Sequence, residues 1–469
     1  MRPKDPDVLI VGSGFSGIVA ANVLADHHLD VLLLDENVHV GGQILRSVPE
    51  RLGTQTAAVS DGVRRAGFRF INNLQRKKVH IMNRAVALGI YPNRELLVEV
   101  EGKRVLVLRP KIVLFATGAR ERFLPFPGWT LPGVISTGAV QILMKSSGVL
   151  FSREILIGGA GLFLLAVAHD FQKNGGKVMA VLDETPMTNK LLLLTQLVHH
   201  FSKLTQGVGY IAHLALAGVP IRYQTRILEA RGDSQLKEVI TSKVDRSGSA
   251  TEGKKKAHET GALAVGYGFC PNIELPQLAG CCIEYDETKG GWVVKVSDQL
   301  ESTVENVFAA GEITGIAGAL KSLNEGRMAA VAILRRLGKI REKDFSPKFK
   351  RLAQERRRHL QFGRCFNRLY SVPDEAFRQI PPETIVCRCE DVTVGDVRRA
   401  IEQGCHTPGA VKKATRIGMG PCQGRTCGPV LYGLIAAYTR RSPQEIPLLS
   451  VRSPTKPVSM SALLTCDVP

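Results

Sequence analysis

The chain has 469 residues, a formal net charge of +19 and a hydrophobic content of 44%. This length predicts two or three domains rather than one core, and no run reaches the ~18 uninterrupted apolar residues that a membrane-spanning helix needs. Residues 1–7 are polar and lead into an apolar stretch without a secretory signal, so we expect a cytoplasmic protein that is not transmembrane, with a peripheral position at the inner face of the membrane left open.

The first predicted elements form a βαβ unit: a strand at residues 8–11, a helix over residues 12–26 and a strand at residues 31–34. Its strand turns into its helix through Gly12, Gly14 and Gly17. The first glycine permits the tight turn, the second lets a pyrophosphate approach the backbone, and the third brings helix and strand together. Glu36 follows the second strand, 19 residues after Gly17, in position for a ribose diol. This pattern predicts a dinucleotide site.

Three later turns extend this pattern. They are Gly42-Gln43, Thr117-Gly118 after a predicted strand at residues 111–115, and Gly311-Glu312 after one at residues 307–310. A helix near residues 319–334 would direct the positive end of its dipole toward a ligand at the last turn.

A second βαβ unit begins at residue 154 and repeats the first, which predicts a two-lobed α/β protein. Leu164 stands where Gly or Ala normally lets the helix pack on the strand. The sequence therefore argues against NAD binding there and favours a retained structural fold or a different nucleotide.

Residues 335–368 carry thirteen Lys or Arg and three acids. Phe345 and Phe349, like Phe362 and Phe366, are four residues apart, as on the apolar face of a helix. Two interpretations stay open, a linker helix with a solvated basic face and a docking face for an acidic partner subunit. Nothing in the chain has the signature of a nucleic-acid-binding fold, so we expect no nucleic acid partner.

Four of the ten cysteines form two pairs, Cys387-x-Cys389 and, after 32 intervening residues, Cys422-x4-Cys427. In a reducing compartment, clustered cysteines indicate ligands or redox groups rather than disulfides. Thiolates suit iron–sulfur clusters or zinc, but a Cys-x-Cys pair fits the usual zinc spacing poorly. Neighbouring basic residues and glycines favour an anionic [2Fe–2S] cluster, with zinc or a purely structural site as the alternatives.

The cysteine pairs are separated by a predicted helix that Thr393 and Asp396 would cap and that ends at Gln403, and by a short helix at residues 410–417. This frame resembles the BFD-like [2Fe–2S] domain, and the resemblance implies that the four paired cysteines ligate the cluster. Cys405 lies outside the pairs, and we expect it to pack in the domain.

The glycine turns together resemble the two-dinucleotide-binding flavoproteins of the pyridine-nucleotide-disulfide reductase type. That resemblance implies one FAD, with a binding set of Gly12, Gly14, Gly17, Glu36, Gly42, Gln43, Val86, Thr117, Gly118, Gly311 and Glu312. Glu312 stands where the family more often has Asp. No Cys-x2-Cys or Cys-x4-Cys follows Gly42 or lies in the second unit, which excludes disulfide-reductase chemistry.

With the proline-rich segment at residues 125–133 and the cysteine pairs, the chain resembles the FAD/[2Fe–2S] subunit of multi-subunit amino-acid dehydrogenases. Members of that group are the B subunit of hydrogen cyanide synthase, the A subunit of opine oxidase and the α subunits of proline and hydroxyproline dehydrogenases.

The resemblance implies a hetero-oligomer with a D-amino-acid-oxidase-like flavoprotein subunit, and it leaves open a small ferredoxin-like subunit. FMN at a subunit interface and ATP or NAD at the second site are also left open. No catalytic acid or base is nominated on this chain. The rival interpretations are a stand-alone NAD(P)H-dependent FAD oxidoreductase and a non-catalytic nucleotide-binding scaffold subunit.

These patterns predict the domain organisation. In chain order we expect an FAD-binding domain at residues 1–125, a second nucleotide-binding-like domain at 126–300, a return segment at 301–340, a basic linker at 341–381, the [2Fe–2S] domain at 382–440 and a C-terminal tail at 441–469.

Overall fold

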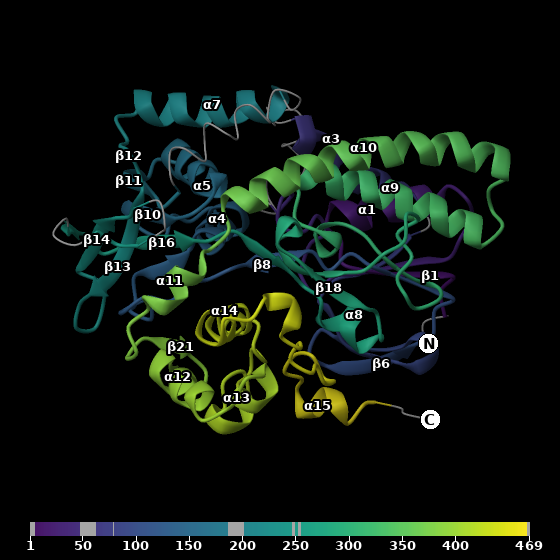
Figure 1. The fold of residues 1–469 in the computed structure, drawn as a ribbon. Helices are drawn as coiled ribbons and strands as arrows, with labels where there is room; N and C mark the ends of the chain where they lie inside the picture. Colours follow the sequence, from purple (N-terminus) through teal and green to yellow (C-terminus); the bar gives the residue numbers. More distant parts are fainter. Residues whose placement is uncertain are drawn as a thin grey trace. The chain divides into compact units, whose positions relative to one another are not determined.

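The computed structural model describes residues 5–46, 62–77, 79–185, 201–245, 249–251 and 255–466, with the side chains of residues 201–204 left out. The chain divides into two units by its internal contacts. Unit 1 contains Met1–Arg120, Cys270–Asn367 and Val451–Pro469, and unit 2 contains Glu121–Phe269 and Arg368–Ser450. Figure 1 shows how the chain forms the two units, with colours that follow the sequence.

Unit 1 is built on a five-stranded parallel sheet of order β20-β7-β1-β2-β3. Its central strands β1 (Val8–Val11), β2 (Val31–Leu34) and β7 (Ile112–Phe115) are apolar and fully buried, as strands of a parallel sheet covered on both faces are. The outer strands are β3 (Val79–Met82) and β20 (Val307–Ala309). The expected first βαβ unit is therefore present.

Helices and a second sheet complete unit 1. Helix α1 (Phe15–Ala25) packs against α9 (Ala319–Arg336), and the two backbones come so close that a Cβ on Gly326 would overlap the backbone of Ser16. The antiparallel sheet consists of β4 (Ala85–Tyr91), β5 (Glu95–Val100) and β6 (Arg104–Leu108). The remaining elements are α3 (Gly62–Arg76), α8 (Glu274–Leu278), β18 (Ile283–Asp286), β19 (Gly291–Val294) and α15 (Met460–Leu463).

The basic segment is a single long helix, α10 (Glu342–Leu369). Phe345 and Leu352 are buried in the same core as α1 and α9, and the ring centroids of Phe345 and Phe349 are 5.0 Å apart. The helical prediction is confirmed. The segment differs from the expected linker because its apolar stripe packs on unit 1.

Unit 2 contains a second parallel sheet, of order β12-β11-β10-β16-β9. Its strands are β9 (Val134–Ser136), β10 (Glu154–Gly159), β11 (Lys177–Asp183), β12 (Ile221–Tyr223) and β16 (Leu263–Gly266). The helices α4 (Thr137–Ser147), α5 (Leu162–Lys173) and α7 (Phe201–Leu216) belong to it, with an antiparallel sheet of β13 (Thr225–Arg231), β14 (Glu238–Lys243) and β15 (Lys256–Glu259).

The C-terminal part of unit 2 is a small, mostly helical domain. It consists of α11 (Asp374–Arg378), β21 (Ile385–Cys387), β22 (Val392–Thr393), α12 (Val394–Glu402), α13 (Pro408–Thr415) and α14 (Gly428–Thr439). Its core is continuous with that of β10, β11 and the 124–129 segment. The two units thus differ from the expected segments, because the chain returns to unit 1 at Cys270 rather than at 301, and the tail joins unit 1 from Val451.

The expected cap of α12 is present as a full capping box. The Asp396 carboxylate accepts from the Thr393 amide at 2.9 Å, and the Thr393 hydroxyl accepts from the Asp396 amide at 3.2 Å. The Thr393 amide is the largest cause that lowers the pKa of Asp396 below its ordinary value of 3.8. Stability from this carboxylate is therefore present above that value and is lost as the pH falls through the lowered pKa.

We expect Asp396→Asn to lower the unfolding free energy by about 0.5–1 kcal/mol at neutral pH. The difference from wild type should shrink in the acidic range, because Asp396 is then protonated in both states of the wild type. Thermal unfolding across pH measures this. Glu402→Gln is the matched control, since Glu402 only pairs with Arg398 on the exposed face of the same helix. A difference that stays constant with pH would contradict the prediction.

Candidate functional site

The glycine loop of unit 1 lies at the carboxyl end of β1. Gly12 has φ +106°, and a side chain there would overlap the carbonyl of Ala116, so only glycine fits this turn. A Cβ on Gly17 would overlap the carbonyl of Gly12, which explains how close α1 lies to the strand. Gly42 reaches the same place, since its Cβ would be 2.8 Å from the Cα of Gly14. The structure therefore brings Gly12, Gly14, Gly17 and Gly42 together.

Asp35, an acid that the sequence analysis did not select, holds this loop in place. Buried Asp35 accepts from the Ser13 amide at 2.8 Å and the Ser13 hydroxyl at 2.5 Å, and also from the Asn37 amide at 2.8 Å. Asp35 thus joins the glycine loop to the end of β2. The side chain of its neighbour Glu36 is 52% exposed and pairs with Lys456, so Glu36 is the acid that a ligand can reach.

Two further turns of the predicted set directly follow the strands β7 and β20. The Thr117 hydroxyl donates to the Asn272 carbonyl at 2.8 Å. In return, the Asn272 side-chain amide donates to the Thr117 carbonyl at 2.9 Å, and the Asn272 backbone amide donates to the Gly118 carbonyl at 3.0 Å. Gly311 packs against the Ser16 hydroxyl in α1. Gln43 is exposed, and Val86 is a half-buried residue of β4.

Below the Gly311 turn lies a buried ionic network that the sequence analysis did not find. Lys321 and Glu325 are fully buried and 2.9 Å apart. The Lys321 ammonium also donates to the carbonyls of Gly311 at 2.6 Å and Gly315 at 3.0 Å, and the Glu325 carboxylate accepts from the Gly311 amide at 2.8 Å. Arg356 of α10 supplies a second cation, 2.7 Å from Glu325. These ions hold the turn in shape.

Glu312 turns its carboxylate toward the start of α9. It accepts from the Gly318 amide at 3.0 Å and the Ser322 hydroxyl at 3.2 Å. Burial raises the pKa of Glu312, against the opposing effects of Lys321 and the nearby amides. The Glu312 side chain, which is longer than the more usual Asp, thus reaches the N-terminal end of α9, the end that was expected to face a ligand.

The loop fits a dinucleotide on two observations. No side chain caps the start of α1, which leaves its first amides available to a phosphate. The space beside Gly14 is open, since a Cβ there would meet no atom within 4 Å. FAD bound here would supply a redox-active flavin, and the glycine loop and Glu36 would hold its pyrophosphate and its adenosine ribose.

The second nucleotide unit is different. Leu164 stands at the position that corresponds to Gly17. Its side chain is 1% exposed and lies in the core of unit 2. Glu184 follows β11 as Glu36 follows β2, but it is paired with Arg226 at 2.7 Å, and both side chains are about nine-tenths buried. The acid at the position that corresponds to Glu36 is thus paired with a protein cation.

The four paired cysteines come together in the small domain of unit 2. Hydrogen bonds between sulfurs join Cys387 to Cys427 and Cys389 to Cys422. The bond from Cys427 is the largest cause that lowers the pKa of Cys387, to about 5. None of the ten cysteines forms a disulfide.

Backbone amides surround these sulfurs, as the nearby glycines suggested. Gly418 and Glu390 donate to Cys387, and Gly424 and Thr426 donate to Cys422. Gly420 leaves room for Cys389, whose side chain a Cβ there would overlap.

The strand that carries Cys387 is anchored by Trp129, which lies in the proline-rich segment at residues 125–133. Its Nε1 donates to the Ile385 carbonyl at 2.6 Å, and the Arg388 guanidinium lies 5.5 Å from its ring centroid.

The donor set fits a two-iron cluster. The thiols form two pairs, which suits two irons that share four cysteine ligands. Amide donors stabilise the anionic sulfurs of such a centre. A [2Fe–2S] cluster bound here would supply a one-electron acceptor.

The comparisons with known proteins agree with both sites. The family model for pyridine nucleotide-disulphide oxidoreductases matches residues 6–333, and that for the BFD-like [2Fe-2S] binding domain matches residues 385–437. The first family indicates FAD and the second a [2Fe–2S] cluster. The chain is an oxidoreductase with a mixed α/β fold. Among the helices that the structure describes, none has both the length and the apolar content to cross a membrane.

Curated relatives match over nearly the whole chain. The A subunit of opine oxidase from Rhizobium meliloti (strain 1021) is 31% identical over 458 residues, and the HcnB subunit of hydrogen cyanide synthase from Pseudomonas aeruginosa is 30% identical over 465 residues, each match covering 97% of both chains. The solved structure of L-proline dehydrogenase from P. horikoshii has a TM-score of 0.70 at 19% identity, covering 98% of this chain and 79% of that one, and supports the fold.

These matches confirm the resemblance stated from the sequence. The chain belongs to the pyridine nucleotide-disulphide oxidoreductase family and carries a BFD-like [2Fe–2S] binding domain at its C-terminal end.

Proposed function

We propose that this chain is the electron-transfer subunit of a multi-subunit amino-acid dehydrogenase and passes electrons between FAD and a [2Fe–2S] cluster. The carrying observation is that one chain combines an uncapped nucleotide loop with two amide-lined thiol pairs. Oxidation of a C–N bond releases two electrons, a [2Fe–2S] cluster takes one, and a flavin exchanges either number.

The binding residues are part of this proposal. The FAD set is Gly12, Gly14, Gly17, Glu36, Gly42, Gln43, Val86, Thr117, Gly118, Gly311 and Glu312, and the cluster ligands are Cys387, Cys389, Cys422 and Cys427. The domain segments at residues 1–125, 126–300, 301–340, 341–381, 382–440 and 441–469 are part of the same proposal.

The substrate is proposed to be oxidised on a partner subunit, a flavoprotein of the D-amino-acid-oxidase kind, so the functional form is a hetero-oligomer. The names of the relatives, which are subunits of opine oxidase and of hydrogen cyanide synthase, support assembly and an amino acid or opine as the substrate class. FMN at an interface and a further, ferredoxin-like subunit belong to the same proposal.

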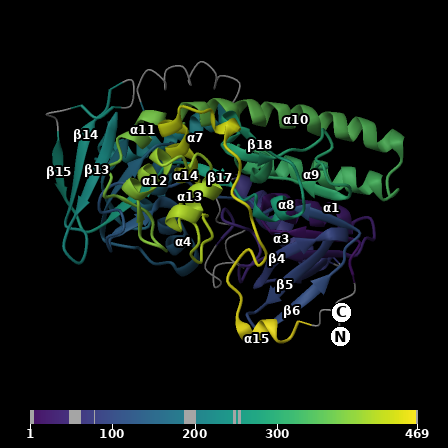
Figure 2. The ribbon, with the colours of Figure 1, turned by 60° about the horizontal axis from the view of Figure 1, so that its bottom comes forward.

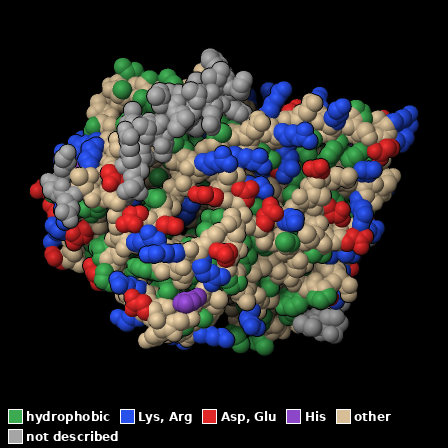
Figure 3. Space-filling view, viewed as in Figure 1, with side chains coloured by type: hydrophobic (Ala, Val, Ile, Leu, Met, Phe, Trp, Pro, Cys, Tyr) green, Lys and Arg blue, Asp and Glu red, His purple; other side chains and the backbone are tan. Residues whose placement is uncertain are grey.

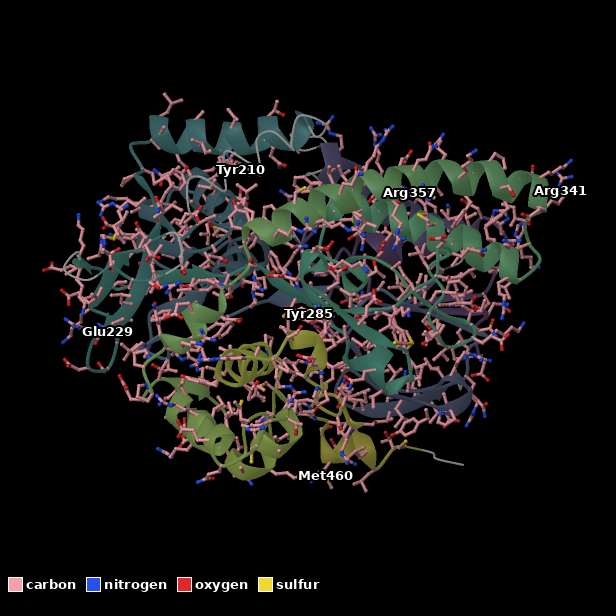
Figure 4. The ribbon with its side chains drawn as sticks, viewed as in Figure 1. Tyr210, Glu229, Tyr285, Arg341, Arg357 and Met460 are labelled. Carbon is pink, nitrogen blue, oxygen red and sulfur yellow. The ribbon has the colours of Figure 1, made fainter. Side chains whose placement is uncertain are left out.

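The exposed face of α10 is the proposed contact with an acidic surface of that partner. Lys and Arg side chains gather along this helix (Figure 3). Figure 4 labels Arg341 at the start of α10 and Arg357 further along it, and both are exposed. Complementary charge on a partner accelerates association and makes it sensitive to salt.

The test is purification from the native host, followed by cofactor extraction and anaerobic reduction assays. We expect a complex with a second flavoprotein, and flavin that is bleached by one amino acid or opine. NADH should reduce it much more slowly, because Glu184 is paired with Arg226 and Leu164 fills the third motif position. A chain that is isolated alone and rapidly reduced by NADH would favour the stand-alone reductase. A complex that no amino acid or opine reduces would favour the scaffold subunit.

A further inference from the structure

The C-terminal tail crosses back onto the antiparallel sheet of unit 1. The Thr455 amide donates to the Leu88 carbonyl at 2.6 Å, and its hydroxyl donates to the Ala87 carbonyl at 3.2 Å. Further along, Thr465 accepts from the Val105 amide at 3.1 Å. Figure 2 shows the tail running beside β4 and reaching β6 at α15, and Figure 4 labels Met460 at the start of that helix.

The sheet is shaped to receive this tail. The pairing of β4 with β5 shifts between Ala87 and Gly89, so Leu88 is the extra residue of a bulge and its carbonyl is free of the ladder. Gly89 has no side chain in the way, since a Cβ there would overlap Ser453. Ala462 is fully buried against Leu88 and Val105. The contact thus combines hydrogen bonds with apolar packing.

This attachment brings Lys456 to Glu36. The Lys456 ammonium is hydrogen-bonded to Oε2 of Glu36, and the two side chains are 37% and 52% exposed. Among the described residues, no hydrogen bond reaches the other oxygen, Oε1. The acid proposed for the ribose is thus held by a residue 420 positions away in the chain.

We propose that the tail completes the FAD site, because Lys456 holds the Glu36 carboxylate in position and leaves Oε1 to accept from the adenosine ribose. Lys456 is a positioning residue that acts through Glu36. A carboxylate fixed before binding loses less conformational freedom when it takes up a ribose hydroxyl. The inference rests on the FAD site proposed above.

The test compares FAD affinities of the full-length protein after the flavin is stripped and titrated back, with flavin fluorescence as the readout. We expect Lys456→Met to raise the dissociation constant by about threefold to fivefold, the effect of losing a half-exposed ion pair. Lys456→Arg should restore most of the affinity. Lys103→Met is the matched control, because Lys103 is an exposed lysine paired with Glu101 at the β5–β6 turn, and it should bind FAD like wild type.

A double-mutant cycle with Glu36→Gln separates positioning from a general effect of the tail. The Lys456→Met/Glu36→Gln pair should bind FAD no more weakly than Glu36→Gln alone. Losses that add up in the double mutant would overturn the inference. Unchanged or tighter FAD binding in Lys456→Met would overturn it as well, and tighter binding would mean that Lys456 competes with the ribose for Glu36. If Glu36→Gln weakens binding and Lys456→Met does not, only the inference fails. If wild type takes up no FAD, the proposed function fails as well.

Discussion

Cys389→Ala should remove the iron–sulfur cluster while the FAD stays bound. The wild type, purified anaerobically, is expected to hold about two irons and two acid-labile sulfides per chain, ligated by four thiolates. A single lost ligand leaves one iron with an open position, and the other three paired cysteines are already used as ligands. Iron and sulfide should fall close to zero, and the signal of the reduced cluster in electron paramagnetic resonance should disappear.

The flavin content should not change, since the glycine loop belongs to unit 1 and the cysteines to unit 2. Cys405→Ala is the matched control, because Cys405 packs at the edge of the same core without joining a thiol pair. Zinc in place of iron in the wild type, or equal iron loss in the Cys405→Ala control, would contradict the cluster assignment and remove the electron path that depends on it.

Lys321→Met should strongly destabilise unit 1. The change leaves the buried Glu325 carboxylate with Arg356 as its remaining cation and removes the donor to the carbonyls of Gly311 and Gly315. Breaking a buried ion pair by removing one partner costs about 3–5 kcal/mol. Because these groups shape the turn that precedes Glu312, we also expect weaker FAD retention.

Urea unfolding followed by circular dichroism, with flavin release recorded in the same titration, measures both effects. The two units need not unfold together, so the transition of unit 1 is the quantity to compare. Lys339→Met is the control, since Lys339 is exposed and its replacement should change stability by less than about 0.5 kcal/mol. A Lys321→Met protein as stable as this control would show that the buried network does not support the turn.

Most of the correct predictions came from short-range patterns in the sequence. The alternation of apolar runs and glycines predicted both βαβ units, because strand burial and tight turns are encoded within a few residues. Thr393 and Asp396 predicted a helix start for the same reason, since a capping box is complete within four residues. The Cys-x-Cys spacing favoured an iron–sulfur cluster over zinc, and the matched [2Fe–2S] domain agrees with that prediction.

The contacts that complete the sites were not predictable from spacing. Each of these contacts joins residues that lie far apart in the sequence. The hydrogen-bonded pairs are Asn272 and Thr117, 155 positions apart, Arg226 and Glu184, 42 apart, and Lys456 and Glu36, 420 apart. A charged residue in the sequence has many candidate partners of opposite charge, and only the folded backbone selects one.

The sequence by itself determined which local elements form and which chemistry the glycines and thiols support. The tertiary structure decided which acid a ligand can reach, because Asp35 and Glu184 are buried against protein partners, whereas the side chain of Glu36 is 52% exposed although it pairs with Lys456. Local turn chemistry depends on neighbouring residues, whereas the state of a buried or shared charge depends on what distant segments bring against it.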